Sequence, residues 1–181
     1  MIEGAGAREV LWPKLSGKRR EIAHARDALA RVDFVFVGGG DVEVGVQALR
    51  DAELVDAMHT AATRGVIFAG MSAGAIMLGE RWIRWPHDGA GDDEAQTYEC
   101  LGIAPCSLDT HGEADGWRET QSFAAVRARE TGKKVRAYAV PSGGALVIGA
   151  SGTPKARGRP VPVFAATSGE KAKRERTLEV K

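Results

Sequence analysis

The chain has 181 residues, 44% of them hydrophobic and 27% charged, which predicts a soluble globular protein with a substantial core. Its 25 Lys and Arg nearly balance its 24 Asp and Glu, and the net charge of +1 gives no electrostatic reason to expect nucleic acid or a membrane as a partner. No apolar run reaches the roughly 18 residues of a membrane span. The N-terminus lacks the apolar segment of a secretory signal, and Cys100 and Cys106 have neither disulfide-scaffold nor metal-site spacing. We therefore expect a cytoplasmic protein with no metal and no cofactor.

Apolar runs and helical patterns alternate along the chain. In order, they predict a strand at 9–15, a helix at 18–30, strands at 34–37 and, after a helix at 53–64, at 66–69, a strand-like run at 103–108, a helix at 118–131 and a strand at 135–140. Residues 87–97 are polar and read as a surface loop. The alternation predicts an α/β domain at 1–170 with a mainly parallel sheet covered on both faces, followed by a charged, flexible tail at 171–181.

The sharpest motif is the pentapeptide Gly70-Met71-Ser72-Ala73-Gly74, which follows an apolar strand and precedes a short helical pattern. This is the sequence form of a nucleophile elbow, a tight turn that projects a serine hydroxyl from a strained backbone. The backbone N–H of Ala73 would then be the first donor to an oxyanion. A simple strand-to-helix turn in which small residues pack is the alternative.

Three successive glycines, Gly38, Gly39 and Gly40, end the strand at 34–37. The carboxyl ends of strands in an open α/β sheet are where ligands bind. A dinucleotide site is excluded because the third glycine of its motif would fall on Glu43, and the chain has no phosphate-binding loop. Oxyanion donors and a plain tight turn remain as interpretations.

A nucleophilic serine needs a base, and His111 is the histidine that follows a strand-like run. We expect it on the same edge as Ser72. An orienting carboxylate could come from Asp88, Asp109, Glu113 or Asp115, and the sequence does not choose among them.

Three strings, VGGGD, FAGMSAGAIMLG and CLGIAPCSLDTH, resemble the peptidase E (aspartyl dipeptidase) and cyanophycinase family over about residues 9–150. The resemblance implies a class I glutamine amidotransferase-like fold, here a three-layer sandwich with a doubly wound sheet. It also implies metal-free hydrolysis of peptide bonds next to aspartate, through an acyl-enzyme. By carry-over, Ser72 is the nucleophile and His111 the base, and Gly39 or Gly40 forms the oxyanion hole with Ala73.

The chain departs from the family pattern at two places. Ser142 stands where the family has the glutamate of the triad, so another carboxylate is needed, and Asp88 is the first substitute by its place in the loop after the elbow helix. The family also has an interior strand and a helix before the segment at 9–15. Without that strand we expect unpaired backbone and uncovered apolar faces, and a truncated start or a strand from a partner as explanations.

Recognition of an acidic side chain needs a cation, and Arg84 is the substrate-binding candidate. The acidic run at 113–115 beside His111 favours a small peptide over a specifically aspartyl one. We expect a serine hydrolase acting on small peptides, with a homo-oligomer left open. The alternatives are a catalytically weak or inactive binding module on the same fold, and an esterase of the α/β-hydrolase type that uses Ser72, Asp88 and His111.

Overall fold

A computed structural model describes residues 6–13, 15 and 19–180, apart from the side chains of residues 19 and 20. The helices are α1 (Arg19–Arg31), α2 (Val42–Asp51), α3 (Val55–Thr63), α4 (Ala73–Leu78) and α5 (Arg118–Thr131). The strands are β1 (Phe34–Val37), β2 (Ile67–Gly70), β3 (Arg81–Arg84), β4 (Gln96–Glu99), β5 (Leu108–Thr110), β6 (Val135–Val140), β7 (Ala145–Ile148), β8 (Pro154–Arg157), β9 (Val161–Ala166) and β10 (Lys173–Leu178). The fold is therefore mixed α/β.

The strands form parallel and antiparallel pairs. β1 pairs with β2 in parallel, and β5 pairs with β6 in parallel within a four-stranded sheet of order β10-β9-β6-β5. The pairs β6–β9, β9–β10, β3–β4 and β7–β8 are antiparallel. The expectation of a mainly parallel sheet was thus wrong for the described residues, because the strands after α5 return through hairpin turns and not through crossover helices. The three-layer, doubly wound arrangement stays a prediction.

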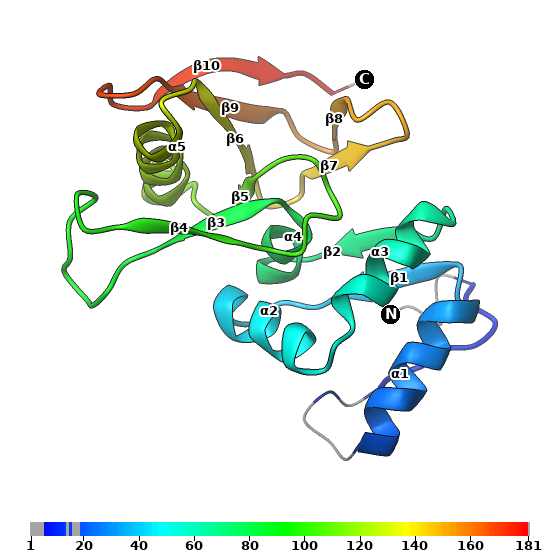
Figure 1. Cartoon of the computed structure of the whole chain (residues 1–181). Coiled ribbons are helices and arrows are strands. Elements are labelled where there is room, and N and C mark those ends of the chain that lie inside the picture. Colours follow the sequence, from blue (N-terminus) through cyan, green and yellow to red (C-terminus); the bar gives the residue numbers. More distant parts are fainter. Residues whose placement is uncertain (1–5, 14, 16–18, 181) are drawn as a thin grey trace.

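The short helix α4 joins the two parts of the fold, since it contacts both β2 and β5 (Figure 1). Its residues Ile76 and Met77 are buried in one core with Met58 of α3, Leu108 of β5 and Val163 of β9. Each such side chain contributes about 1.5–3 kcal/mol when it leaves water. This shared core therefore fixes α4 against both β2 and β5.

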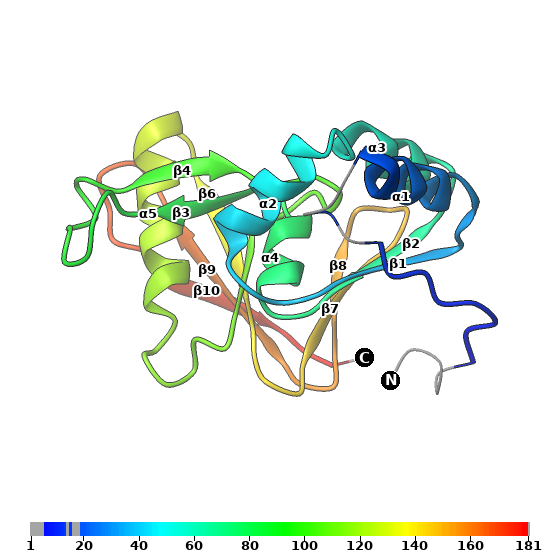
Figure 2. The same cartoon turned by 90° about the horizontal axis from the view of Figure 1, so that it is seen from below.

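The helix α5 packs against β6 and β9 and also against the β3–β4 hairpin. Trp82 of β3 stacks on Phe123 of α5 with ring centroids 5.3 Å apart, and both side chains are buried. The segment predicted as a surface loop, 87–97, is a turn as far as Ala95, and its last two residues begin β4. Figure 2 shows the turn of this hairpin projecting away from α4.

One edge of β1 has no strand beside it among the described residues. Val37 accepts a backbone hydrogen bond from Met71, so alternate residues of β1 face β2, and the N–H and C=O groups of Phe34 and Phe36 face the open edge. An apolar groove runs along this edge, and the large side chains of Phe34 and Trp12 near it are exposed. The described residues therefore leave both backbone groups and apolar surface uncovered at this edge.

Two segments differ from their predicted structure. Among the described residues of 9–15 no strand forms, because a strand requires a partner to pair with. Instead of a flexible tail at 171–181, Lys173–Leu178 form β10 and pair with β9, so the domain continues past residue 170. Lys134 and Arg136 both contact Glu175 and hold this edge strand to β6.

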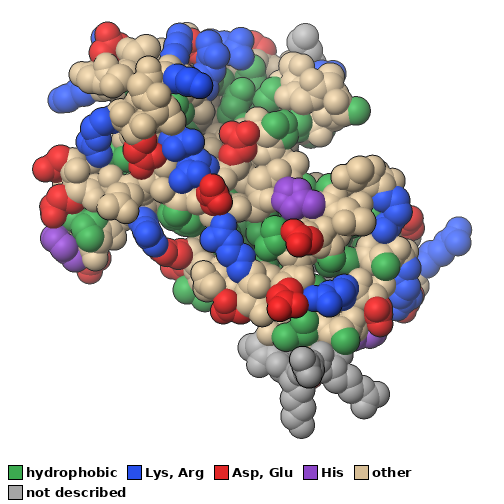
Figure 3. Space-filling view, in the orientation of Figure 1, with side chains coloured by type: hydrophobic (Ala, Val, Ile, Leu, Met, Phe, Trp, Pro, Cys, Tyr) green, Lys and Arg blue, Asp and Glu red, His purple; other side chains and the backbone are tan. Residues whose placement is uncertain are grey.

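Acidic and basic side chains are interspersed over the face seen in Figure 1, as Figure 3 shows. Among the helices of the described residues, none is long and apolar enough to cross a membrane.

Candidate active site

Ser72 occupies the turn between β2 and α4 in a backbone conformation that non-glycine residues rarely adopt, with φ 55° and ψ −131°. Such strain persists only where the surroundings enforce it, and it is typical of functional positions. The side chain of Ser72 is half-buried, so its hydroxyl lies at the surface of the site and not inside the core. This strained turn between a strand and a helix supports the expected nucleophile elbow, whose catalytic role stays a prediction.

The two glycines of the motif permit this turn by close backbone approach. A Cβ on Gly70 would lie 2.5 Å from the backbone nitrogen of Ala75, and a Cβ on Gly74 would lie 2.7 Å from the carbonyl carbon of Val37. Both distances are shorter than real Cβ contacts. Any side chain at these positions would separate α4 from β1 and β2, which explains the spacing of the motif.

Gly39 lies directly against the serine. A Cβ on Gly39 would be 3.2 Å from Ser72 Cβ and 3.6 Å from Ser72 Oγ, whereas a Cβ on Gly40 would meet nothing within 4 Å. Ala73 is the first residue of α4, so its backbone N–H has no partner within the helix. Gly39 and Ala73 therefore flank the Ser72 hydroxyl, and Gly40, with φ 140°, serves the turn into α2.

The parallel pairing of β5 and β6 brings His111 and Ser142 together. Thr110 is paired with Val140, so the residues that follow each strand leave the sheet side by side. His111 Nδ1 lies 3.4 Å from Ser142 Oγ. If Nδ1 carries the proton and donates it to Ser142, Nε2 has the free lone pair that a general base needs.

Glu113 is the carboxylate at this pair. Its Oε1 accepts a hydrogen bond of 2.5 Å from the backbone N–H of Ser142. This N–H, followed by the backbone N–H of Glu113 itself and then by the hydroxyl of Ser142, lowers the pKa of Glu113 below its ordinary value. Arg159 donates to the carbonyl of Ser142 at 3.1 Å and so holds the turn from its other side. Sequence reasoning missed Arg159, because only the β7–β8 hairpin brings it back to Ser142.

The segments that carry Ser72 and His111 are linked through α4, which contacts β5. The carboxyl end of α4 lies at the start of β5, where Glu80 donates a backbone hydrogen bond of 2.8 Å to Cys106. That Ser72, before α4, and His111, after β5, share one site stays a prediction. Within the described part of the chain, no hydrogen bond joins Ser72 to His111.

Two of the other carboxylates have structural partners. Asp109 is buried and accepts hydrogen bonds from the hydroxyl of Thr120 and the backbone N–H of Thr110, both at 2.7 Å, and burial raises its pKa. Asp115 accepts from the backbone N–H groups at the start of α5. Neither carboxylate is therefore free to orient His111.

Asp88 lies in the turn between β3 and β4, where its carbonyl oxygen is 3.1 Å from His87 Nδ1. Figures 1 and 2 show that this turn extends away from α4. No hydrogen bond connects Asp88 with His111 in the described residues, so the structure does not bring the first substitute acid to the base.

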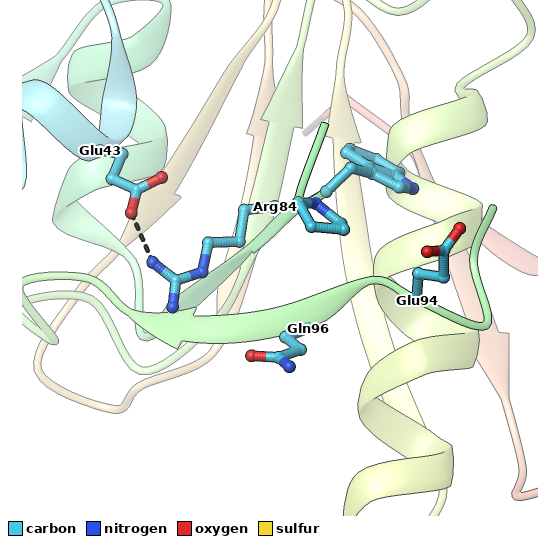
Figure 4. A pocket seen from close by; sticks show the side chains of 6 residues that line it. Glu43, Arg84, Glu94 and Gln96 are labelled. Atoms are coloured by element: carbon cyan, nitrogen blue, oxygen red, sulfur yellow. Dashed lines mark hydrogen bonds and ion pairs between the residues drawn. The ribbon is translucent and has the colours of Figure 1, made fainter. Parts of the chain in front are cut away.

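Arg84 is paired with an acidic residue. Its guanidinium lies 2.6 Å from Glu43 Oε1 and over the ring of Tyr98, and both members of the ion pair are about half exposed. Figure 4 shows this pair in a pocket lined also by Glu94 and Gln96. Since Glu43 neutralises Arg84, the role of Arg84 in binding an acidic substrate stays a prediction.

The comparisons with known proteins point to one family. The profile of Peptidase family S51 matches residues 9–153. Among solved structures, the chain is similar to a peptidase from an acI-B1 Actinobacterium, with 15% identity and a TM-score of 0.49 over 90% of this chain. The chain spans 66% of the length of that peptidase. None of the curated proteins is similar enough to count as a relative. Because the family profile covers most of the chain, with Ser72 and His111 inside the match, the chain belongs to Peptidase family S51.

Proposed function

We propose that this chain is a serine hydrolase of the peptidase E type, which cleaves small peptides through an acyl-enzyme intermediate. The observation that carries the proposal is the strained turn at Ser72 with Gly39 packed against its side chain. A strained serine at the start of a helix serves no evident packing purpose, and an exposed serine hydroxyl near backbone N–H groups is what acyl transfer requires.

In the proposed reaction, Ser72 Oγ attacks the scissile carbonyl carbon while His111 Nε2 takes the hydroxyl proton. The N–H groups of Gly39 and Ala73 donate to the oxyanion of the tetrahedral intermediate. The amine leaves with the proton from Nε2, and a water molecule then hydrolyses the ester of Ser72 by the same steps. The hydrogen bond between Ser72 and His111 is expected to form in the substrate complex, since such contacts are often long before substrate binds.

The expected substrate is a small peptide. Glu113 near His111 adds negative charge to the site, and Glu43 neutralises Arg84, so neither favours an anionic group. Dipeptides with an N-terminal aspartate, which the family resemblance suggests, are therefore one class to be tested among others. A cytoplasmic location and a homo-oligomeric state also stay predictions.

The test is labelling by a fluorophosphonate probe, which reacts with activated serines. We expect the wild-type chain to be labelled at Ser72 and Ser72→Ala to remain unlabelled. A panel of dipeptides, with and without N-terminal aspartate, then identifies the substrate, and Ser72→Ala should abolish its turnover. Unchanged turnover in Ser72→Ala would refute the mechanism.

A binding module without turnover is the second candidate, and the lack of a hydrogen bond between Ser72 and His111 among the described residues is the observation in its favour. That candidate predicts no probe labelling and no turnover of any dipeptide, together with saturable binding of peptides to the wild-type chain and to Ser72→Ala alike. The two functions therefore give opposite results in one experiment.

A further inference from the structure

Resting on the proposed function, we infer that Glu113 supplies the negative charge of the catalytic group and acts on His111 through the hydroxyl of Ser142. Glu113 is thus a positioning residue and not a direct member of the triad. The inference assigns the acid of this site to the loop after β5, where the family resemblance pointed to the turn after β6 or to Asp88.

Two contacts link His111 to Ser142 and Ser142 to Glu113. His111 Nδ1 is 3.4 Å from Ser142 Oγ, and Glu113 Oε1 is 2.5 Å from the backbone nitrogen of Ser142. The hydroxyl next to the ring thus belongs to the residue whose N–H binds the carboxylate, and this hydroxyl also helps to lower the pKa of Glu113. A serine hydroxyl can accept from the first and donate to the second at the same time.

The fold holds these groups in place from both loops. His111 adopts a left-handed conformation with φ 66°, which turns the chain so that Glu113 returns toward Ser142. Ser142 is fixed on both sides, because its N–H donates to Glu113 and its C=O accepts from Arg159. Both loops start from paired positions of β5 and β6, so the arrangement does not depend on a long flexible segment.

The charges balance without moving a proton to Glu113. When Nε2 takes the proton of Ser72, the ring becomes an imidazolium whose Nδ1–H donates to Ser142 Oγ. The hydroxyl of Ser142 donates to Glu113, which stays a carboxylate and stabilises the positive ring. The proton on Nε2 then passes to the leaving amine, and the ring returns to its neutral form.

The main test variant is Glu113→Gln. Glutamine keeps an oxygen that can accept from the backbone of Ser142, so the turn is retained and only the charge is lost. We expect kcat on the best dipeptide, and the rate of fluorophosphonate labelling, to fall about ten- to a hundredfold with KM little changed. The loss should be smaller than the ~10⁴-fold that follows when a direct partner of the histidine is neutralised, because Ser142 still holds the ring.

Glu170→Gln is the matched control, since it makes the same change in the turn between β9 and β10. That turn follows Ala166, which pairs with Val135 at the opposite end of β6 from Ser142. Five residues of strand separate the two ends, roughly 17 Å. We expect wild-type kcat and labelling in this variant.

The double variant Glu113→Gln/Ser142→Glu separates charge from structure, because it returns a carboxylate directly to His111 Nδ1. Recovery of kcat above that of Glu113→Gln would support the inference. If the folded double variant stays as slow as Glu113→Gln, Glu113 only shapes the turn and the inference is overturned. Wild-type kcat in Glu113→Gln, with Ser72→Ala inactive, would also overturn it while leaving the proposed function intact. Full activity in Ser72→Ala would instead overturn the proposed function.

Discussion

The close approach of α4 to the end of β1 is tested most directly at Gly74. A Cβ there would meet the backbone carbonyls of Val37 and Gly38, with the carbonyl carbon of Val37 at 2.7 Å, where ordinary contacts begin at 3.4 Å. The obstacle is backbone and cannot rotate away. In Gly74→Ala, α4 must therefore move from β1 by about 1 Å, a displacement that strains a packed core.

The expected magnitudes follow from this shift. Overpacking costs about 1–3 kcal/mol, and alanine returns up to about 1 kcal/mol because it is a better helix residue than glycine. We expect a net loss of about 1–2 kcal/mol, which lowers Tm by roughly 2–8 °C in a domain of this size. Because the shift separates Ser72 and Ala73 from Gly39, labelling of Ser72 by a fluorophosphonate should slow about a hundredfold.

Two neighbouring glycines provide matched controls. A Cβ on Gly38 would meet nothing within 4 Å, so Gly38→Ala should keep both Tm and labelling rate. Gly39→Ala, whose Cβ would touch Ser72 Cβ at 3.2 Å, should slow labelling with a smaller loss of Tm. Wild-type behaviour of Gly74→Ala, or equal damage from Gly38→Ala, would refute the packing argument.

Two further predictions concern stability and reactivity. Hydrogen bonds from Arg136, then from Lys134, lower the pKa of Glu175 to about 2. Because this native pKa lies below the ordinary value of 4.5, the stabilisation is complete above that pH and is lost as pH falls toward about 2. Glu175→Gln should therefore lower the free energy of urea unfolding by about 0.5–1 kcal/mol at pH 7 and by less at pH 3, and a gap that widens in acid would contradict this. Burial raises the pKa of Cys100 and Cys106 to about 12, so neither thiol should react with a disulfide reagent at pH 8 until the chain is denatured. Rapid reaction of the native chain would show that the core around β4 and β5 is open.

Local patterns in the sequence were sufficient for the elements that carry the site. The strands at Phe34–Val37 and Val135–Val140 and the helix at Arg118–Thr131 have their predicted bounds, because a buried apolar run or an amphipathic repeat is set by neighbouring residues. The turn at Ser72 could also be predicted, because its glycines are required where the backbones of α4, β1 and β2 come close together.

Strand order and strand partners could not be predicted from these local patterns. The hairpins after β6 make the sheet mixed, and the charged residues from Lys173 form an edge strand because β9 offers them a partner. The strand-like run was predicted at 103–108, whereas β5 spans Leu108–Thr110 and so begins five residues later. Pairing joins residues far apart in the chain, so composition over a short window does not reveal it.

The amino-acid sequence by itself determined the candidates for the chemistry, because a tight serine turn and a histidine after a strand each depend on a few adjacent residues. Only the tertiary structure shows which carboxylate lies beside Ser142, the residue that contacts His111. Asp88, Asp109, Glu113 and Asp115 are equivalent as sequence, and they were separated by the parallel register of Thr110 with Val140, which sets Glu113 against Ser142 and leaves the others elsewhere. The reason is physical: the field of a charge depends on distance in space, and the packing of distant segments sets that distance.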